Sequence, residues 1–277
     1  MQSAQKIPVF VISLVRDADR RATISAHLNK FGVEFEFVDA VEGKALPAGE
    51  IEGMLAPGAS MTPGQVGCYL SHLETYRRIV ERKIPVSLIL EDDARLSVSA
   101  LKLLRSDLGE SPPFDYCFLD SENFNDKGPI FYDSSKTYPL GGAFEAHPLS
   151  HGPLTTHAFL ISGAAAQKRL DHGFPIHWPI DMYDHLPYPI SFLAVIRPKL
   201  AWLGELGIQS STFERHSGVR VSLRFMKKSH WYYRVRELLL LKRLTWMREV
   251  REAQRQGRIS PDRAWKRMPS GRQIITE

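Results

Sequence analysis

Three consecutive carboxylates, Glu91, Asp92 and Asp93, follow an apolar run in the segment LILEDDA. Adjacent anions repel one another, and a hard divalent cation with oxygen ligands would offset that repulsion. Successive side chains of a strand point to opposite faces, so Glu91 and Asp93 are expected on one side and Asp92 on the other. Glu91 and Asp93 are therefore the first candidate metal ligands, for Mg²⁺ or Mn²⁺. The alternative is an acidic strand end that caps the next helix.

Carboxylates and aromatic rings also gather in the segment WPIDMYDH, which runs from Trp178 to His185. Aromatic faces beside charged hydrogen-bonding groups are typical of sugar-binding sites, and a displacement by a hydroxyl group needs a base to accept its proton. Asp181 is the candidate base and Asp184 the second choice. The acceptor-binding candidates are Trp178, Tyr183 and His185. A short helix start among core aromatics is the alternative.

Main-chain groups of Ser13 and Leu14 could bind a nucleotide base after the first apolar run. The guanidinium groups of Arg16, Arg20 and Arg21 follow at once and could bind phosphate. Arginines at a helix start are also common surface residues. These five residues are candidates for a donor site.

The segment GQVGCYLSH combines small residues with Ser71 and His72, which are further donor-site candidates. Small residues let a ligand or a neighbouring backbone approach closely. Because Ser71 and His72 are adjacent on a predicted helix, they point to different faces, which argues against a serine hydrolase. Among ten histidines, His216 is a further candidate for binding metal or phosphate.

These residues need a scaffold, and the hydrophobic pattern supplies one. Strands are expected at 9–14, 35–41, 86–94, 114–120, 156–162 and 191–197, and helices at 16–31, 65–82, 98–108, 163–170 and 179–186. Segment 43–58 is expected to be a long loop, and 121–153 mainly loops with a short strand near Phe144. The alternation predicts an α/β sandwich with a mainly parallel sheet, in which ligands bind at the carboxyl ends of the strands.

Charge divides the chain into two parts. Residues 220–277 contain 16 Lys and Arg against 5 Asp and Glu, a net charge of +11, whereas residues 1–219 carry −6. Apolar residues recur at helical spacing in the basic part. We expect a catalytic domain at 1–219 and a basic helical region at 220–277 whose partner is an anionic surface. Nucleic acid is disfavoured because the region has no known nucleic-acid motif and the body is acidic.

Composition narrows the class further. Cys68 and Cys117 are far apart and lack the spacing of a zinc site or a disulfide framework, so both are predicted to be buried thiols. No apolar stretch approaches the roughly 18 residues of a membrane span, and the N-terminus lacks a convincing signal peptide. A cytoplasmic location is the simplest expectation.

Taken in order, the motifs resemble glycosyltransferase family 25, the lipooligosaccharide galactosyltransferase type of Gram-negative bacteria. They span roughly residues 8 to 215 and comprise VFVISLVRDADRR, FEFVDAVEGKAL, TPGQVGCYLSHLETYRRIV, LILEDDARL, THAFLISGAAAQKRL, PIDMYDH and IQSSTF. The resemblance implies a GT-A-like, Rossmann-type fold, a UDP-sugar donor, most commonly UDP-galactose, and inversion at the anomeric carbon. It gives Glu91-Asp92-Asp93 the role of the D-x-D motif. Two departures are Ser13, where the family often has Asn, and the unusual segment Tyr183-Asp184-His185.

The resulting hypothesis is a single displacement in which Asp181 deprotonates an acceptor hydroxyl, while a metal and arginines stabilise the departing diphosphate. The basic region would bind an anionic membrane surface, and the acceptor would be a lipid-linked oligosaccharide at the inner face of the bacterial inner membrane. Helices that simply pack on the catalytic domain are the alternative for this region. Alternative functions are a nucleotidyltransferase, a nucleic-acid-binding protein and a family member that binds donor without catalysis.

Overall fold

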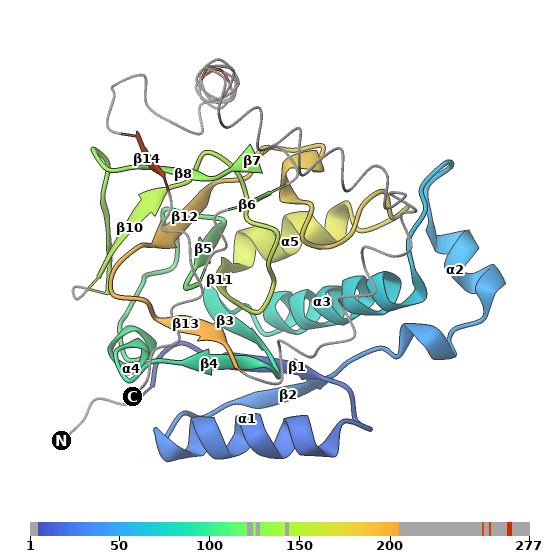
Figure 1. The fold of residues 1–277 in the computed structure, drawn as a ribbon, viewed down its shortest axis with the longest axis horizontal. Coiled ribbons are helices and arrows are strands. Elements are labelled where there is room, and N and C mark those ends of the chain that lie inside the picture. The colour runs from blue at the N-terminus through green and yellow to red at the C-terminus, as the bar shows by residue number, and fades with distance from the viewer. Residues whose placement is uncertain are drawn as a thin grey trace, which may run out of the picture.

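The first part of the chain alternates strands and helices, as the hydrophobic pattern predicts (Figure 1). The computed structural model describes residues 5–120, 124–125, 128–141, 144–204, 251, 255 and 265–267. The opening elements are β1 (Val9–Ser13), α1 (Ala18–Lys30), β2 (Glu36–Asp39), η1 (Gly43–Ala45), α2 (Ala48–Met54), α3 (Pro63–Glu81) and β3 (Val86–Glu91). There follow β4 (Ala94–Leu96), α4 (Ala100–Leu104), β5 (Tyr116–Phe118), β6 (Phe124–Asn125), β7 (Gly128–Pro129), β8 (Phe131–Asp133), β9 (Tyr138–Leu140), β10 (Phe144–Pro148), β11 (Ala158–Ser162), α5 (Gly163–Asp171), η2 (Tyr183–His185), β12 (Phe192–Val195), β13 (Ala201–Leu203) and β14 (Trp265–Arg267).

The central sheet has eight strands in the order β2-β1-β3-β11-β5-β12-β10-β9. β1 is parallel to β2 and β3, and β12 is parallel to β5. β11 lies antiparallel between β3 and β5, and β10 is antiparallel to β12 and β9. Six strands therefore run in one direction and two in the other. This confirms a mixed α/β fold with a mainly parallel sheet, but the reversal of β11 was not predicted.

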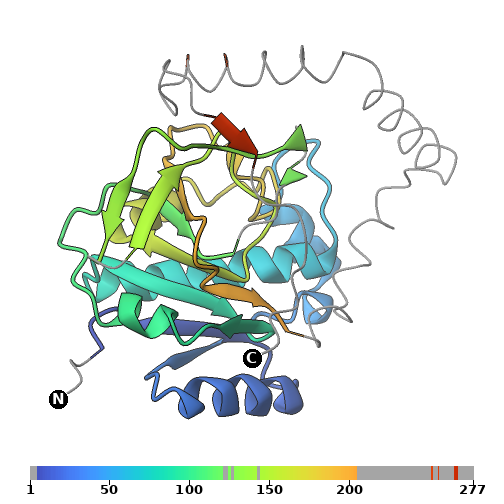
Figure 2. The same ribbon diagram turned by 60° about the vertical axis from the view of Figure 1, so that its left-hand side comes forward.

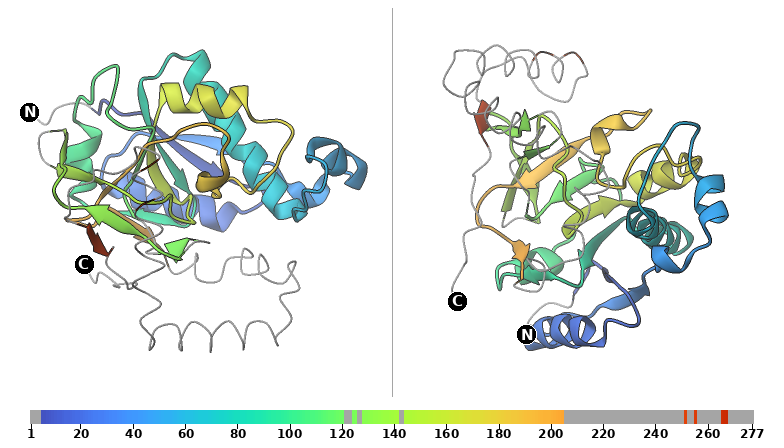
Figure 3. Two further views of the ribbon diagram at one scale, coloured as in Figure 1. Left: turned by 90° about the horizontal axis from the view of Figure 1, so that it is seen from above. Right: turned by 45° about the vertical axis from the view of Figure 1, so that its right-hand side comes forward.

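Alternation along the buried strands builds a hydrophobic core on each face of the sheet. In β1, Val9 and Val11 face one core, together with Ile24 and Leu28 of α1 and residues of α4. The neighbouring residues of β1 face the other core, which contains the apolar sides of α3 and α5. Figure 3 shows α3 and α5 side by side on that second face. The result is a three-layer α/β/α arrangement.

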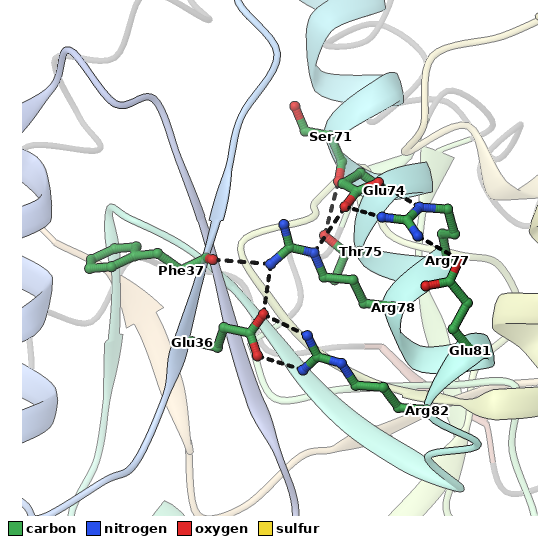
Figure 4. Close-up of polar contacts among 9 residues, drawn as sticks. All are labelled: Glu36, Phe37, Ser71, Glu74, Thr75, Arg77, Arg78, Glu81 and Arg82. Carbon is green, nitrogen blue, oxygen red and sulfur yellow. Dashed lines mark hydrogen bonds and ion pairs between the residues drawn. The ribbon is translucent and has the colours of Figure 1, made fainter.

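Helix α3 is fixed at both of its ends. At its start, Thr62 and Gln65 form a reciprocal capping box, which satisfies two backbone N–H groups. Near its end, Arg78 and Arg82 both donate to the carboxylate of Glu36 on β2, with an Arg78 Nη1 to Glu36 Oε1 distance of 2.7 Å (Figure 4). These contacts hold the helix that carries Ser71 and His72 against the edge of the sheet.

Two expectations of loop structure were wrong. Segment 43–58 contains η1 and the short helix α2, which buries only Ile51. The sequence did not predict this helix because it contains Gly49 and Gly53, and glycine has low helix propensity. Segment 121–153 was expected to be mainly loops with a short strand near Phe144; that strand is β10, but β6, β7, β8 and β9 precede it, and β9 joins the central sheet beside β10. The pairing of β4 with β13, which forms a two-stranded ribbon, was not predicted.

Most of the predicted basic helical region, and the predicted boundary at residue 219, lie outside the described residues. Within that region Arg251 and Arg255 are helical, and β14 pairs antiparallel with β8 (Figure 2). In the part of the chain that the structure describes, no helix is long and apolar enough to cross a membrane.

Gly67 marks a close approach between α3 and the chain that follows β2. A Cβ atom at Gly67 would lie 2.5 Å from the carbonyl oxygen of Val41 and 2.6 Å from the backbone nitrogen of Gly43. Sequence reasoning left open whether the small residues here admit a ligand or a neighbouring backbone. At Gly67 it is the backbone.

We therefore expect Gly67→Ala to lower the free energy of unfolding by about 1–3 kcal/mol, because the added methyl group meets main-chain atoms that are held in place. Gly64→Ala in the same helix is the matched control, since a Cβ atom there has nothing within 4 Å. Its stability should be unchanged or should rise by up to about 1 kcal/mol. Urea titration compares the two variants, and equal effects would contradict this account.

Candidate active site at the carboxyl edge of the sheet

The reversal of β11 brings distant segments to one edge of the sheet. β3 ends at Glu91, and antiparallel β11 begins beside it, with Ala158 opposite Leu90. The backbone N–H of Glu91 donates to the carbonyl of His157 at 3.0 Å. The residues just before β11 therefore lie at the same edge as the carboxyl ends of β1, β3 and β5. This is the edge at which α/β sheets bind ligands.

Asp92 and Asp93 form a buried acidic turn. Asp92 accepts hydrogen bonds from Ser13 Oγ at 2.6 Å and from Arg20 Nε at 2.7 Å. Arg20 Nη2 also donates to Asp93 Oδ2 at 3.0 Å. The two aspartates thus share one guanidinium, whereas Glu91 has other neighbours. The charge of Glu91 raises the pKa of Asp93, so these two carboxylates lie close together, as the alternation predicts. Asp92 is not isolated on the other side, because Arg20 contacts both aspartates.

Arg20 supplies counter-charge that sequence reasoning assigned to a metal alone. Burial lowers the pKa of Arg20, but hydrogen bonds to and charges of Asp92 and Asp93 raise it by more, so the guanidinium stays charged. For Asp93, burial and the charge of Glu91 outweigh the attraction of Arg20 and raise the pKa from 3.8 to about 6. The carboxylate of Asp93 is therefore only partly compensated.

One oxygen of this turn remains available. Asp93 Oδ1 is buried and finds no hydrogen-bond partner among the described residues. A buried carboxylate oxygen without a partner is costly, and a cation or a ligand hydroxyl would satisfy it. The residues at the turn therefore fit a hard divalent cation beside Arg20, with Asp93 as its ligand.

Glu91 faces α3 and the segment before β11. It accepts a short hydrogen bond from Thr156 Oγ1, and its Oε1 lies 3.7 Å from His72 Nε2. Ser71 points elsewhere, since its hydroxyl accepts from the N–H of Val41 and donates to Gly67 O at 2.6 Å. The prediction that Ser71 and His72 face different ways is confirmed. Of these two residues, His72 points toward the acidic segment, whereas Ser71 joins α3 to the chain after β2.

A second polar cluster at this edge was not assigned to the site from the sequence. His157 Nε2 lies 3.2 Å from Asp120 Oδ2, and Lys199 Nζ lies 3.1 Å from Asp120 Oδ1. Burial lowers the pKa of His157, but the hydrogen bond and charge of Asp120, with the charges of Asp93 and Glu91, raise it by more. The sequence signals were the carboxylate of Asp120, which ends the fourth predicted strand, and the position of His157 near other polar residues. Nothing in the sequence placed Lys199 beside Asp120.

The predicted nucleotide-binding arginines have unequal surroundings. Arg21 donates to the main-chain carbonyls of Ser13 at 2.7 Å and Leu14 at 3.2 Å. The guanidinium of Arg21 and the carbonyls of Ser13 and Leu14 were expected to bind the donor, but here they bind one another. Arg16 lies at the surface with its side chain 53% exposed, where it forms an ion pair with Glu42. Of these two arginines, Arg16 is the one more open to a phosphate.

Tyr183 belongs to the core, although it was a candidate acceptor-binding residue. It is 2% exposed, its ring packs on Tyr116 and Phe118 at centroid distances of 5.1 and 5.5 Å, and its hydroxyl donates to Thr155 O. Its ring therefore does not present a face to a sugar. Trp178, by contrast, is 45% exposed and packs on His185 with ring centroids 4.5 Å apart.

Asp181 and Asp184 are partly buried and differ in their contacts. Asp184 Oδ1 accepts a hydrogen bond from the N–H of Gly152, which fixes the loop before β11. Burial and the neighbouring Tyr116 raise the pKa of Tyr183 well above its usual range, and the negative charges of Asp181 and Glu91 contribute. The carboxylates of Asp181 and Glu91 thus both lie near Tyr183, which places Asp181 toward the acidic edge. His216 lies outside the described residues.

The fold is an α/β sheet with a buried acidic turn at the carboxyl edge, which is the edge where such sheets bind ligands. The chain belongs to glycosyltransferase family 25 (LPS biosynthesis protein), whose sequence model matches residues 6–183. The predicted family resemblance is confirmed.

Three curated relatives illustrate the range of similarity. Procollagen galactosyltransferase 1 of Danio rerio is 37% identical over 100 residues, 32% of this chain and 17% of its own length. Human procollagen galactosyltransferase 2 is 32% identical over 97 residues, 31% and 16% of the two chains. The human inactive glycosyltransferase 25 family member 3 is 34% identical over 131 residues, 42% and 22%. The matches thus span less than a quarter of the length of each of these relatives.

The raised pKa of Asp93 gives a test of its burial. Because the folded-state pKa lies above the unfolded value, ionisation costs stability: the cost is absent below about pH 4 and complete above about pH 7, and it is on the order of 3 kcal/mol. Asp93→Asn removes this cost. We expect the free energy of unfolding of Asp93→Asn, relative to wild type, to increase as pH rises from about 4 to about 7. Urea titration in the presence of a chelator measures this difference.

Asp107→Asn is the control, since the Asp107 carboxylate is exposed and its pKa is lowered by the N–H of Gly109 and by Lys6. Its stability relative to wild type should not increase over the same window. A flat difference for Asp93→Asn would mean that Asp93 ionises without penalty.

Proposed function

We propose that this protein is a metal-dependent, inverting glycosyltransferase that moves a hexose, most specifically galactose from UDP-galactose, onto a lipooligosaccharide or LPS core acceptor. The observation that carries the proposal is the buried acidic turn at the carboxyl edge, where Asp93 Oδ1 has an unsatisfied lone pair. Family membership supports the reaction class. The names of two relatives support galactose, and the family description supports the acceptor.

Glu91 and Asp93 are the proposed ligands of the divalent metal, with His216 as a further candidate. Their oxygen atoms suit Mn²⁺ or Mg²⁺. When bound, the metal would supply positive charge against the diphosphate of the donor. Arg20 holds Asp92 and Asp93 in place, and the hydrogen bond from Thr156 orients Glu91. Arg16 is the proposed phosphate contact because its guanidinium lies at the surface.

The proposed chemistry is one displacement at the anomeric carbon. Asp181 accepts the proton of the acceptor hydroxyl as the new glycosidic bond forms and the bond to UDP breaks. A single attack from the face opposite the leaving group inverts the configuration, so no covalent sugar intermediate forms. The exposed ring of Trp178, which packs on the half-buried ring of His185, is the proposed surface for binding the acceptor sugar.

The first test measures UDP release from a panel of UDP-sugars, with truncated lipooligosaccharide as acceptor and with or without Mn²⁺. We expect turnover with UDP-galactose that requires metal. Asp93→Asn should reduce turnover by about 10²-fold or more, because the proposed metal loses a ligand and its positive charge no longer stabilises the departing diphosphate. Asp107→Asn, at the exposed carboxylate described above, should match wild type.

Two other outcomes distinguish the alternatives. Release of pyrophosphate from a nucleoside triphosphate would favour a nucleotidyltransferase. Binding of UDP-galactose without turnover on any acceptor would favour a donor-binding member without catalysis, like the relatives whose names mark them as inactive.

A second test concerns the base. Asp181→Asn should lower kcat by about 10²–10⁴-fold and leave the KM for UDP-galactose nearly unchanged, since a base acts on the acceptor and not on donor binding. Asp184→Asn should have a smaller effect on kcat, because its carboxylate binds the backbone of Gly152. A larger kcat loss in Asp184→Asn would exchange the roles of these two residues.

We also propose that the basic segment 220–277 holds the enzyme on the inner face of the inner membrane. Its net charge of +11 supports this, at about 1 kcal/mol for each Lys or Arg near an anionic surface. The full-length protein should sediment with phosphatidylglycerol vesicles and be released by salt. Equal sedimentation with neutral phosphatidylcholine vesicles, or none with either, would contradict an electrostatic attachment.

A further inference from the structure

Three side chains with different donor atoms converge where α3 meets the end of β3. Cys68 and His72 lie one helical turn apart on α3, so they share one face of the helix. Glu91 reaches them from the last position of β3. One ligand atom from each, the thiol sulfur, an imidazole nitrogen and a carboxylate oxygen, lie within 4.8 Å of one another. This arrangement is independent of the contacts that Arg20 makes with the acidic turn.

The imidazole of His72 is the second observation that points to a ligand. The side chain is fully buried, and neither of its ring nitrogens finds a hydrogen-bond partner within the described ranges. Its ring stacks on Phe159, with centroids 5.9 Å apart, which fixes the ring plane beside Glu91. A buried imidazole whose nitrogens form no hydrogen bond costs free energy that a metal–nitrogen bond would recover.

The distances suit a metal ion between these groups. His72 Nε2 and Glu91 Oε1 are 3.7 Å apart. Two ligands on one tetrahedral zinc ion, at bond lengths of about 2.0–2.1 Å, lie about 3.3–3.5 Å apart. A small inward movement of the partly exposed side chains of Glu91 and Cys68 is sufficient. Glu91 is 24% exposed, so an ion can enter from the solvent side.

We infer that Cys68, His72 and Glu91 form a transition-metal site selective for Zn²⁺ over Mg²⁺ and Mn²⁺. A thiolate, an imidazole and a carboxylate are the donors that zinc favours, whereas Mg²⁺ and Mn²⁺ favour oxygen ligands throughout. Binding releases the thiol proton of Cys68 to solvent, because the thiolate is the ligand. Three protein ligands leave a fourth tetrahedral position for water.

The metal at this site would join helix α3 to strand β3. It would also take Glu91 away from a hard cation at Asp93, so the two metals compete for one carboxylate. The inference goes beyond the proposed transferase activity and does not depend on it, since it concerns metal binding by the protein alone.

The test is a titration of metal-free full-length protein with Co²⁺, which reports thiolate ligation by its absorption. We expect one equivalent to produce a thiolate-to-cobalt charge-transfer band and visible bands of tetrahedral cobalt, both lost on adding Zn²⁺. Cys68→Ser should lose the charge-transfer band, and His72→Gln should lose the tetrahedral bands. Cys117→Ala is the matched control, because that thiol is fully buried on the opposite face of the sheet and should leave both bands unchanged.

Asp93→Asn separates this site from the proposed donor-metal site and should keep both bands. Circular dichroism shows whether each variant is folded, and Zn²⁺ binding by calorimetry gives a second measurement on any folded variant. Octahedral cobalt without a charge-transfer band in wild type, or bands that persist in both Cys68→Ser and His72→Gln, would overturn the assignment. Either result leaves the UDP-release test unaffected, so the two proposals fail separately.

Discussion

The ion pairs from Arg20 to Asp92 and Asp93 are the interaction on which the acidic edge depends. Two buried carboxylates side by side would otherwise repel each other in a region of low dielectric. Arg20 comes from the first turn of α1, so the pairs also join α1 to the turn after β3. Ser13 at the end of β1 adds a third contact to Asp92. The N-terminal strand and helix are therefore part of the site and not only of its scaffold.

The direction of β11 also determines which side chains lie at the acidic edge of the sheet. An antiparallel strand between β3 and β5 starts where its neighbours end, so it delivers Thr156 and His157 to the carboxyl edge. Thr156 then orients Glu91, and His157 pairs with Asp120. The edge acquires hydroxyl and imidazole groups that a strand running the other way would have placed at the opposite end.

The acidic segment faces two chemically different environments. Asp92 and Asp93 meet a guanidinium and offer oxygen atoms, which are typical ligands of hard cations. Glu91 faces a thiol and an imidazole on α3, which together favour softer metals. The reason for the division is local: the strand ends at Glu91, and the turn sends the following two side chains toward α1. The acidic segment thus meets a guanidinium on one side and a thiol and an imidazole on the other, and Glu91 lies close to both.

The sequence by itself determined the strands and helices around buried apolar runs, the family, and the position of Glu91-Asp92-Asp93 at a strand end. These features depend on local periodicity and on residue order, which a single chain displays. Tertiary structure decided that Asp92 and Asp93 pair through Arg20, that Tyr183 is core, and that Cys68 lies beside His72 and Glu91. Each of these contacts depends on the direction of a strand or on a turn. The approach of Cys68 to His72 and Glu91 could not be predicted, because the sequence spacing of Cys68 and Cys117 does not match that of a metal site. Contacts between residues that are distant in sequence follow from how the layers pack, and hydrophobic period alone does not encode that packing.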